Sequence, residues 1–315
     1  MPKKKAQSPL LIPEQIEIGY LHNVQADSGL VQLHYEHPHG RLFCGDSRDW
    51  LASLEDNSVD LVFADPPYNV QKAEWDTFES QEAYLVWSLE WIKEAARVLK
   101  PTGSMYICGY SEVLADLKHS ASQYFSGCRW LVWHYRNKAN LGNDWGRSHE
   151  SILHLRKTPM FKLRMDDVRI PYGRHTLKYP SHPQASTSAY NNGKLPEEHW
   201  TPNPLGAKPK DVLEIPTTCN GMGEKTPHPT QKPEELLRRL VLAATDEGQL
   251  VLDPFSGSGT ALVVAEQLKR RWLGCDENAQ YNLWAVRRLQ NVVRKSVDEW
   301  IDYDRKNATR RESIR

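Results

Sequence analysis

The chain has 315 residues, a mass of 36.2 kDa, 39% apolar residues, a formal net charge of zero and a mean hydropathy of −0.64. This length allows one large packed domain with a smaller one, and no apolar run is long enough for a membrane-spanning helix. Five scattered cysteines and a start without the apolar run of a signal peptide predict reduced thiols and a soluble, cytoplasmic protein.

Short apolar runs alternate with segments of helical periodicity along most of the chain. The predicted strands are 41–46, 58–65, 103–109, 130–136, 151–157, 249–255 and 270–276, and the predicted helices are 80–99, 111–124, 233–244, 260–269 and 279–294. This alternation implies an α/β fold with a largely parallel sheet and helices on both faces. The pattern breaks between 158 and 227, where proline, asparagine and serine are frequent.

The first motif is Asp65-Pro66-Pro67-Tyr68-Asn69, directly after an apolar predicted strand. Two prolines remove two backbone donors, which leaves the Pro66 carbonyl free and holds the Asp65 carboxylate in a set direction. Two acceptors without a competing donor can bond both hydrogens of an amino group and turn its lone pair outward. Taken alone, the motif is also compatible with a strand-terminating turn that has no chemical role.

The second motif is the segment 253–260, Asp-Pro-Phe-Ser-Gly-Ser-Gly-Thr, again after a predicted strand. Gly257 and Gly259 allow a tight turn, and Thr260 begins a predicted helix whose free N–H groups suit the anionic end of a nucleotide-like cofactor. Asp276 ends the next predicted strand, where a carboxylate can accept bonds from ribose hydroxyls, with Glu277 as the alternative. A dehydrogenase-type dinucleotide site fits less well, because Leu262 stands where that fingerprint has glycine.

Together the two motifs resemble those of the β-class S-adenosylmethionine-dependent DNA amino-methyltransferases, the N6-adenine/N4-cytosine family of the Asp-Pro-Pro-Tyr type. The β order places the Asp-Pro-Pro-Tyr half before the glycine-rich half, and the match covers roughly residues 40–293. The resemblance implies a seven-stranded, mostly parallel Rossmann-like methyltransferase sheet with helices on both faces and a small irregular target-recognition region. It also implies methyl transfer from S-adenosyl-L-methionine to the exocyclic N6 of adenine in a short duplex sequence, with base flipping.

The resemblance further implies roles for individual residues. The catalytic set is Asp65, Pro66, Pro67, Tyr68 and Asn69, in which Tyr68 would stack on the extruded base and Asn69 would line the same pocket. The cofactor-binding set is Asp46, Asp65, Lys232, Asp253, Phe255, Gly257, Gly259, Thr260 and Asp276. Asp46 would bond the cofactor's adenine amino group, unless it only forms a turn. Lys232 lies in a segment, 228–233, that would close over the methionine end.

His149 and Glu150 match a further family segment beside the base pocket, although such a pair alone is more often structural. Neither His149 nor His154 has partners at the spacing of zinc ligands, so no metal site is predicted.

The motifs divide the chain into five predicted parts. These are an N-terminal arm (1–39), a catalytic half (40–157), a target-recognition region (158–227), a cofactor-binding half (228–294) and a charged C-terminal tail (295–315). Basic and aromatic residues gather between 130 and 210, which provides a local basic surface for DNA despite the zero net charge. The alternative for 158–227 is a disordered insertion.

Several alternatives stay open. An N4-cytosine DNA methyltransferase of the same fold is chemically close, whereas an RNA or protein-glutamine methyltransferase fits less well because the first motif begins with aspartate and the motif order is β. A cofactor-binding recognition module without catalysis is disfavoured by the intact first motif. The predicted partner is double-stranded DNA, which places the protein at the nucleoid, with no membrane partner. A homodimer and a cognate restriction endonuclease are further options.

Overall fold

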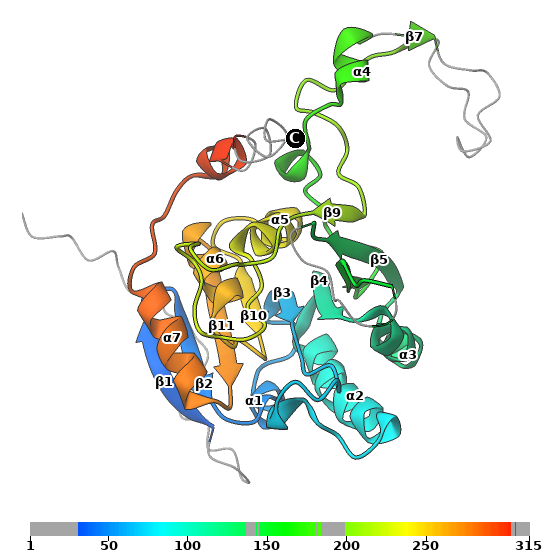
Figure 1. Cartoon of the computed structure of the whole chain (residues 1–315). Helices are drawn as coiled ribbons and strands as arrows, with labels where there is room; N and C mark the ends of the chain where they lie inside the picture. The colour runs from blue at the N-terminus through cyan, green and yellow to red at the C-terminus, as the bar shows by residue number, and fades with distance from the viewer. Residues whose placement is uncertain are drawn as a thin grey trace, which may run out of the picture.

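The computed structural model describes residues 31–136, 143, 145–180, 182–183, 199–303 and 306, so most of the predicted N-terminal arm, residues 1–30, lies outside the described residues. A nine-stranded sheet, in the order β1-β2-β11-β10-β3-β4-β6-β5-β9, passes through the middle of the molecule (Figure 1). Its strands are β1 (Gln32–His37), β2 (Gly40–Cys44), β3 (Val59–Ala64), β4 (Leu99–Gly109), β5 (Gly127–His134), β6 (His149–Arg156), β9 (Val212–Glu214), β10 (Leu250–Asp253) and β11 (Arg271–Asp276).

The central strands β2, β11, β10, β3 and β4 are parallel, whereas β1 is antiparallel to β2, and β6 is antiparallel to β4 and β5. The predicted α/β fold with a mostly parallel sheet is therefore confirmed, and each of the seven predicted strands is present. The strand count was wrong, because β1 and β9 extend the sheet at its two edges. The residues of β1 are exposed or half-buried and β9 has three residues, so neither carries an apolar run that periodicity could detect.

Helices cover both faces of the sheet. The α-helices are α1 (Ser47–Ala52), α2 (Gln81–Val98), α3 (Ser111–Ala121), α4 (Arg174–Lys178), α5 (Glu234–Ala244), α6 (Thr260–Gln267) and α7 (Ala279–Leu289), with short 3₁₀ turns at 74–76, 122–124 and 166–168. One core packs α1, α2 and α3 on one face, around Trp50 and Trp91. The other packs α5, α6 and α7 on the opposite face, around Leu262 and Trp272.

Gly259 shows why the glycine-rich loop tolerates few substitutions. It has a left-handed φ of 74°, and a Cβ there would lie 2.6 Å from the Cβ of Ala285 on α7. Glycine therefore allows α6 to begin in close contact with α7.

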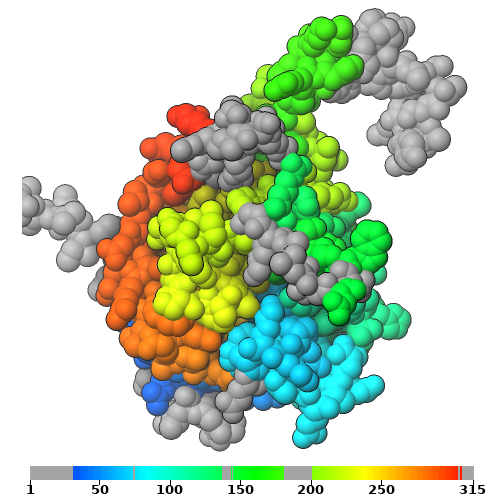
Figure 2. Space-filling view, in the orientation of Figure 1, coloured from blue at the N-terminus to red at the C-terminus, as the bar shows by residue number. Residues whose placement is uncertain are grey.

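A segment projects from the edge of the sheet near β9, and Figures 1 and 2 show its green part, with α4, standing away from the body. An antiparallel bridge between Ile170 and Ala207 closes its base. Two further strands, β7 (His182–Pro183) and β8 (His199–Trp200), pair within it. The predicted target-recognition region is thus composite, because β9 pairs with β5 in the main sheet and Ile215 is buried in the core.

After α7 the described chain forms a helix at 297–303, in which Trp300 is buried beneath the Arg238 guanidinium at 4.4 Å. Among the described residues, no helix combines the length and apolar character needed to cross a membrane.

Candidate active site

A cavity of about 800 Å³ opens where β2, β3, β10 and β11 end. The carboxyl ends of parallel strands meet at one edge of a sheet, which is where open α/β folds bind ligands. Of the predicted site residues, the following line the cavity: Asp46, Asp65, Pro66, Pro67, Tyr68, Lys232, Asp253, Phe255, Gly257, Thr260 and Asp276. Two motifs far apart in the sequence therefore meet in one space.

A buried ion-pair network fixes the Asp65 carboxylate. Lys232 Nζ lies 2.7 Å from Asp65 Oδ2 and 3.3 Å from Glu150 Oε2. The Tyr68 hydroxyl donates to Asp65 Oδ1 at 2.6 Å and lies 3.2 Å from Glu150 Oε2. Burial alone would lower the pKa of Lys232, but Asp65 and Glu150 outweigh it and raise this pKa above its ordinary value. Lys232 is therefore a permanent cation between two carboxylates.

The same surroundings keep Tyr68 protonated, because burial and the charges of Asp65 and Glu150 raise its pKa well above the ordinary value. A protonated hydroxyl can donate to Asp65. Tyr68 also meets Tyr110 edge-on, with ring centroids 5.1 Å apart.

Side chains from outside the Asp65–Asn69 motif hold its backbone in place. Asp76 is buried and accepts bonds from the backbone N–H of Tyr68 at 2.6 Å, Val70 and Lys72. The Tyr84 hydroxyl donates to the Pro67 carbonyl at 2.9 Å. No donor among the described residues bonds the Pro66 carbonyl, which fits the prediction that this acceptor is free for a substrate.

Two predicted residues are not part of the cavity wall. Asn69 has a left-handed φ of 56°, its Oδ1 accepts a bond from the Phe78 N–H at 3.1 Å, and its amide lies 3.4 Å from Gln81. Gly259 lies behind the cavity, against α7. The direct contacts expected for these residues stay predictions.

In the glycine-rich half, Asp276 forms a hydrogen bond with the glycine-rich loop. Its Oδ2 accepts a bond from the Gly257 N–H at 2.7 Å and its Oδ1 one from Asn278 at 2.9 Å. Burial raises the pKa of Asp276 to about 6, although these two backbone bonds oppose the shift. Glu277, the alternative ribose ligand, lines the same cavity.

Asp46 and Phe255 line another part of the wall. Asp46 caps α1 and pairs with Arg48 at 2.8 Å; burial raises its pKa, but the Arg48 hydrogen bonds outweigh burial and lower it. The Phe255 ring packs on Trp87 and Trp91 at 5.7 and 5.1 Å between centroids. A cavity that offers both a carboxylate acceptor and an aromatic ring suits a heterocycle with an exocyclic amine.

Some residues of the observed site were absent from the set predicted from the sequence. Glu150 was indicated only as part of a segment beside the base pocket, whereas it contacts both Lys232 and Tyr68. His228 was likewise indicated only as the first residue of the segment 228–233, and Asp76 carried no signal of its own. His228 lines the cavity, and burial lowers its pKa to about 4, so the imidazole is neutral at physiological pH.

The family model described as DNA methylase, for N6/N4 methyltransferases, matches residues 59–287, nearly three quarters of the chain and both motifs. The chain belongs to this DNA methylase family. The resemblance inferred from the motifs is thereby confirmed.

Curated relatives of this DNA methylase cover most of its length. The type II methyltransferase M.HpaI of Haemophilus parainfluenzae is 34% identical over 82% of this chain and 77% of its own. The DNA adenine methyltransferase YhdJ of Escherichia coli (strain K12) is 32% identical over 81% of this chain and 84% of its own.

Among solved structures, the PvuII cytosine-N4-specific DNA methyltransferase aligns with a TM-score of 0.60 at 20% identity, over 84% of this chain and 90% of that one. TTHA0409 of Thermus thermophilus, a putative DNA modification methylase complexed with S-adenosyl-L-methionine, aligns with a TM-score of 0.53 at 22% identity, over 82% and 99%. These structures share the fold of this methylase.

Proposed function

We propose that this methylase transfers a methyl group from S-adenosyl-L-methionine to the N6 amino group of adenine in a short sequence of double-stranded DNA. The observation that carries the proposal is the fixed pair of acceptors at the end of β3. Lys232 and Tyr68 hold the Asp65 carboxylate, and the Pro66 carbonyl beside it has no donor among the described residues.

The cavity residues fit S-adenosylmethionine. The volume of about 800 Å³ lies within the range of ligand pockets, roughly 300–1,000 Å³. The wall carries the carboxylates of Asp65 and Asp276, and negative charge attracts the cationic sulfonium and ammonium groups of this cofactor. Burial raises the pKa of the third carboxyl, Asp253, well above its ordinary value, so this group favours its neutral form. Asp276 would accept bonds from the ribose, and Asp46 with Phe255 would hold the adenine ring. When bound, the cofactor supplies an electrophilic methyl group.

The first motif would activate the target amine. A carboxylate oxygen has about two lone pairs, so each Asp65 oxygen can bond Lys232 or Tyr68 and still accept from a substrate. With one amine hydrogen on Asp65 and the other on the Pro66 carbonyl, the nitrogen becomes pyramidal and its lone pair turns toward the methyl group. Because the amine would lose a proton when it is methylated, the Asp65 carboxylate would accept that proton, while the Pro66 carbonyl would only orient the amine.

Adenine is favoured over cytosine as the target because YhdJ, a relative of similar length, is named an adenine methyltransferase and because the first motif begins with aspartate. Methylome sequencing of a host that expresses the protein tests this choice. N6-methyladenine at one short sequence is expected. N4-methylcytosine would establish the alternative target, and no new base modification would contradict the proposed activity.

Replacing Asp276 should weaken cofactor binding. Asp276→Ala is expected to cost about 1.5–3 kcal/mol of binding free energy, the scale of hydrogen bonds to a charged group. Because the pKa of Asp276 is about 6, the affinity of the wild type should also fall as the pH drops through 6 and the carboxylate protonates. Calorimetric titration with S-adenosylmethionine below and above pH 6 measures both effects. Glu277→Ala is the matched control, and a larger loss there would make Glu277 the ribose ligand.

The hydroxyl and the aromatic ring of Tyr68 should contribute separately to the rate of methyl transfer. Tyr68→Phe keeps the ring but loses the bond to Asp65, so kcat is expected to fall about tenfold, whereas Tyr68→Ala also loses base stacking of roughly 1–3 kcal/mol. Single-turnover methylation measures the rates. A 2-aminopurine at the target position should brighten on binding to wild-type protein. An alanine variant as active as the phenylalanine variant, without brightening, would exclude stacking by this residue.

We also propose that the predicted target-recognition region, 158–227, reads the DNA sequence mainly through its projecting part. The Ile170–Ala207 bridge gives natural boundaries for a swap of residues 171–206, which leaves β9 in the sheet. Such a chimera with a related enzyme of different specificity should methylate the donor's sequence in the methylome. Retention of the original sequence would place recognition elsewhere. Each base-reading side chain is expected to contribute roughly 1–3 kcal/mol against a wrong base.

The name type II methyltransferase of M.HpaI supports a cognate restriction endonuclease as a further partner. A homodimer and the five-part domain division stay predictions.

A further inference from the structure

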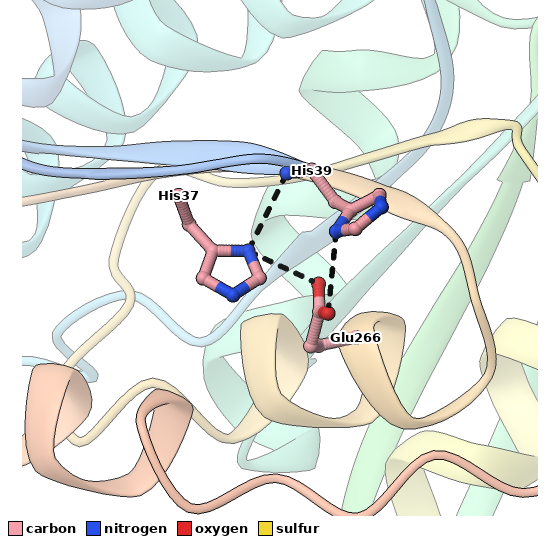
Figure 3. A group of neighbouring side chains, drawn as sticks. All are labelled: His37, His39 and Glu266. Atoms are coloured by element: carbon pink, nitrogen blue, oxygen red, sulfur yellow. Dashed lines mark hydrogen bonds and ion pairs between the residues drawn. The ribbon is translucent and has the colours of Figure 1, made fainter. Parts of the chain in front are cut away.

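A cluster of His37, His39 and Glu266 lies outside the cavity described above. His37 ends β1 and His39 lies in the turn to β2, whereas Glu266 comes from the last turn of α6 (Figure 3). One ligand atom from each residue lies within 4.8 Å of the others. The fold thus brings two imidazoles and a carboxylate together from distant parts of the chain.

The two imidazoles face the carboxylate with their nitrogen atoms. His37 Nδ1 lies 3.6 Å from Glu266 Oε2, and His39 Nδ1 lies 3.4 Å from Glu266 Oε1. Tetrahedral zinc with ligand distances of about 2.0–2.1 Å separates neighbouring ligand atoms by about 3.3 Å. The observed separations are therefore close to those of a zinc ligand set.

The two Nδ1 atoms make few hydrogen bonds with the protein. The His39 backbone N–H lies 3.4 Å from His37 Nδ1, a long and weak hydrogen bond that a metal ion would displace. His39 Nδ1 is buried and has no hydrogen-bond partner. A metal ion could bond the lone pairs of both imidazoles and one of the Glu266 oxygens, which Trp272 and Arg294 leave with further lone pairs.

Other contacts orient Glu266 for such a role. Its carboxylate is 4% exposed and accepts a bond from Trp272 Nε1 at 2.8 Å, and Arg294 lies 2.6 Å from Oε1. Metal-binding carboxylates are commonly held by partners of this kind. The His37 and His39 side chains are 20% and 37% exposed, so solvent can reach the site and complete the coordination.

We propose that His37, His39 and Glu266 form a zinc site that links the β1–β2 hairpin to α6. Two nitrogens and one carboxylate oxygen suit Zn²⁺, with water as the remaining ligand. The ion stabilises the fold by joining the edge of the sheet to the helix that begins at the glycine-rich loop. None of the three residues lines the catalytic cavity, so the site is independent of the proposed function.

Titration of the full chain with Zn²⁺ by calorimetry, and with Co²⁺ by visible absorption, tests the proposal. A Cys219→Ser background removes the exposed thiol. One ion per chain, the strong absorption of tetrahedral Co²⁺ and a higher melting temperature with Zn²⁺ are expected. Loss of a residue that merely supports a ligand costs about 10–100-fold in affinity, so His37→Ala and His39→Ala should each cost at least as much.

The control is His119→Ala, which removes an exposed imidazole from α3 and should bind Zn²⁺ as the parent does. Glu266→Gln keeps the side-chain volume but removes the charge, and it should weaken binding without unfolding the chain in circular dichroism. If the parent binds no stoichiometric Zn²⁺, or if a His37→Ala, His39→Ala double variant binds it equally well, the cluster is only an internal contact and the proposal fails.

Discussion

Asp65→Ala should reduce methyl transfer by about 10²–10³-fold or more, the scale for loss of one preorganised group in a transition state. In the proposed mechanism the carboxylate bonds the target amine, so the loss should fall on kcat, whereas cofactor affinity should change far less because Asp253 and Asp276 remain in the wall. Transfer of a labelled methyl group to DNA measures the rate, and calorimetry measures cofactor binding.

The control for this substitution is Asp298→Ala, which removes an exposed carboxylate far along the chain and should leave the rate unchanged. Asp65→Asn is a sharper variant, since it keeps an acceptor oxygen and removes the charge that pairs with Lys232. Its rate should lie between those of the parent and the alanine variant. Near wild-type transfer by Asp65→Ala would remove Asp65 from the mechanism.

Lys232→Met should be the most destabilising of the substitutions considered. Lys232 lies 2.7 Å from Asp65 and 3.3 Å from Glu150, and its side chain is 6% exposed. Removing one partner of a buried ion pair costs roughly 3–5 kcal/mol because it leaves an uncompensated charge. Methyl transfer should fall as well, since Asp65 loses its fixed direction. Urea unfolding of the variant and of the parent measures the stability change.

The loss of unfolding free energy in Lys232→Met should depend on pH. The folded protein raises the pKa of Lys232, so the stability that this cation contributes is fully present below its ordinary pKa and is lost as the pH rises above it; the difference between parent and variant should therefore be constant around neutral pH and shrink at strongly alkaline pH. Lys93→Met, on the exposed face of α2, is the control and should change stability little. A Lys232→Met protein as stable as the parent would mean that the network contributes nothing to folding.

The fold was largely predictable because its central strands are buried on both sides. All six residues of β3 are buried, and such strands give continuous apolar runs. The edge strands were missed for the opposite reason, because β1 has no buried residue and β9 is too short to show a pattern. The helix α1 has only six residues, which is less than two turns of periodicity.

The candidate site was predictable where a motif carries its own physical argument. Asp65, Pro66 and Asp276 stand at strand ends, where the parallel sheet brings them to one cavity. The partners of these residues were not predictable from local sequence. Nothing near Asp76 indicates that it organises the first motif, and the contact of Glu150 with Lys232 depends on β6 lying beside β4.

The sheet order also constrains how the chain matures as it is made. Although β2 and β3 are neighbours in the sequence, β11 and β10 separate them in the sheet. A nascent chain therefore carries two unpaired inner strand edges until its last strands emerge, and such edges invite aggregation. Lys232 follows Asp65 by 167 residues, which takes roughly 10–30 s at about 5–20 residues per second. The cavity and its Asp65–Lys232 ion pair therefore form only after β10 and β11 have been made, and shorter nascent chains expose strand edges of the kind that pair with other chains.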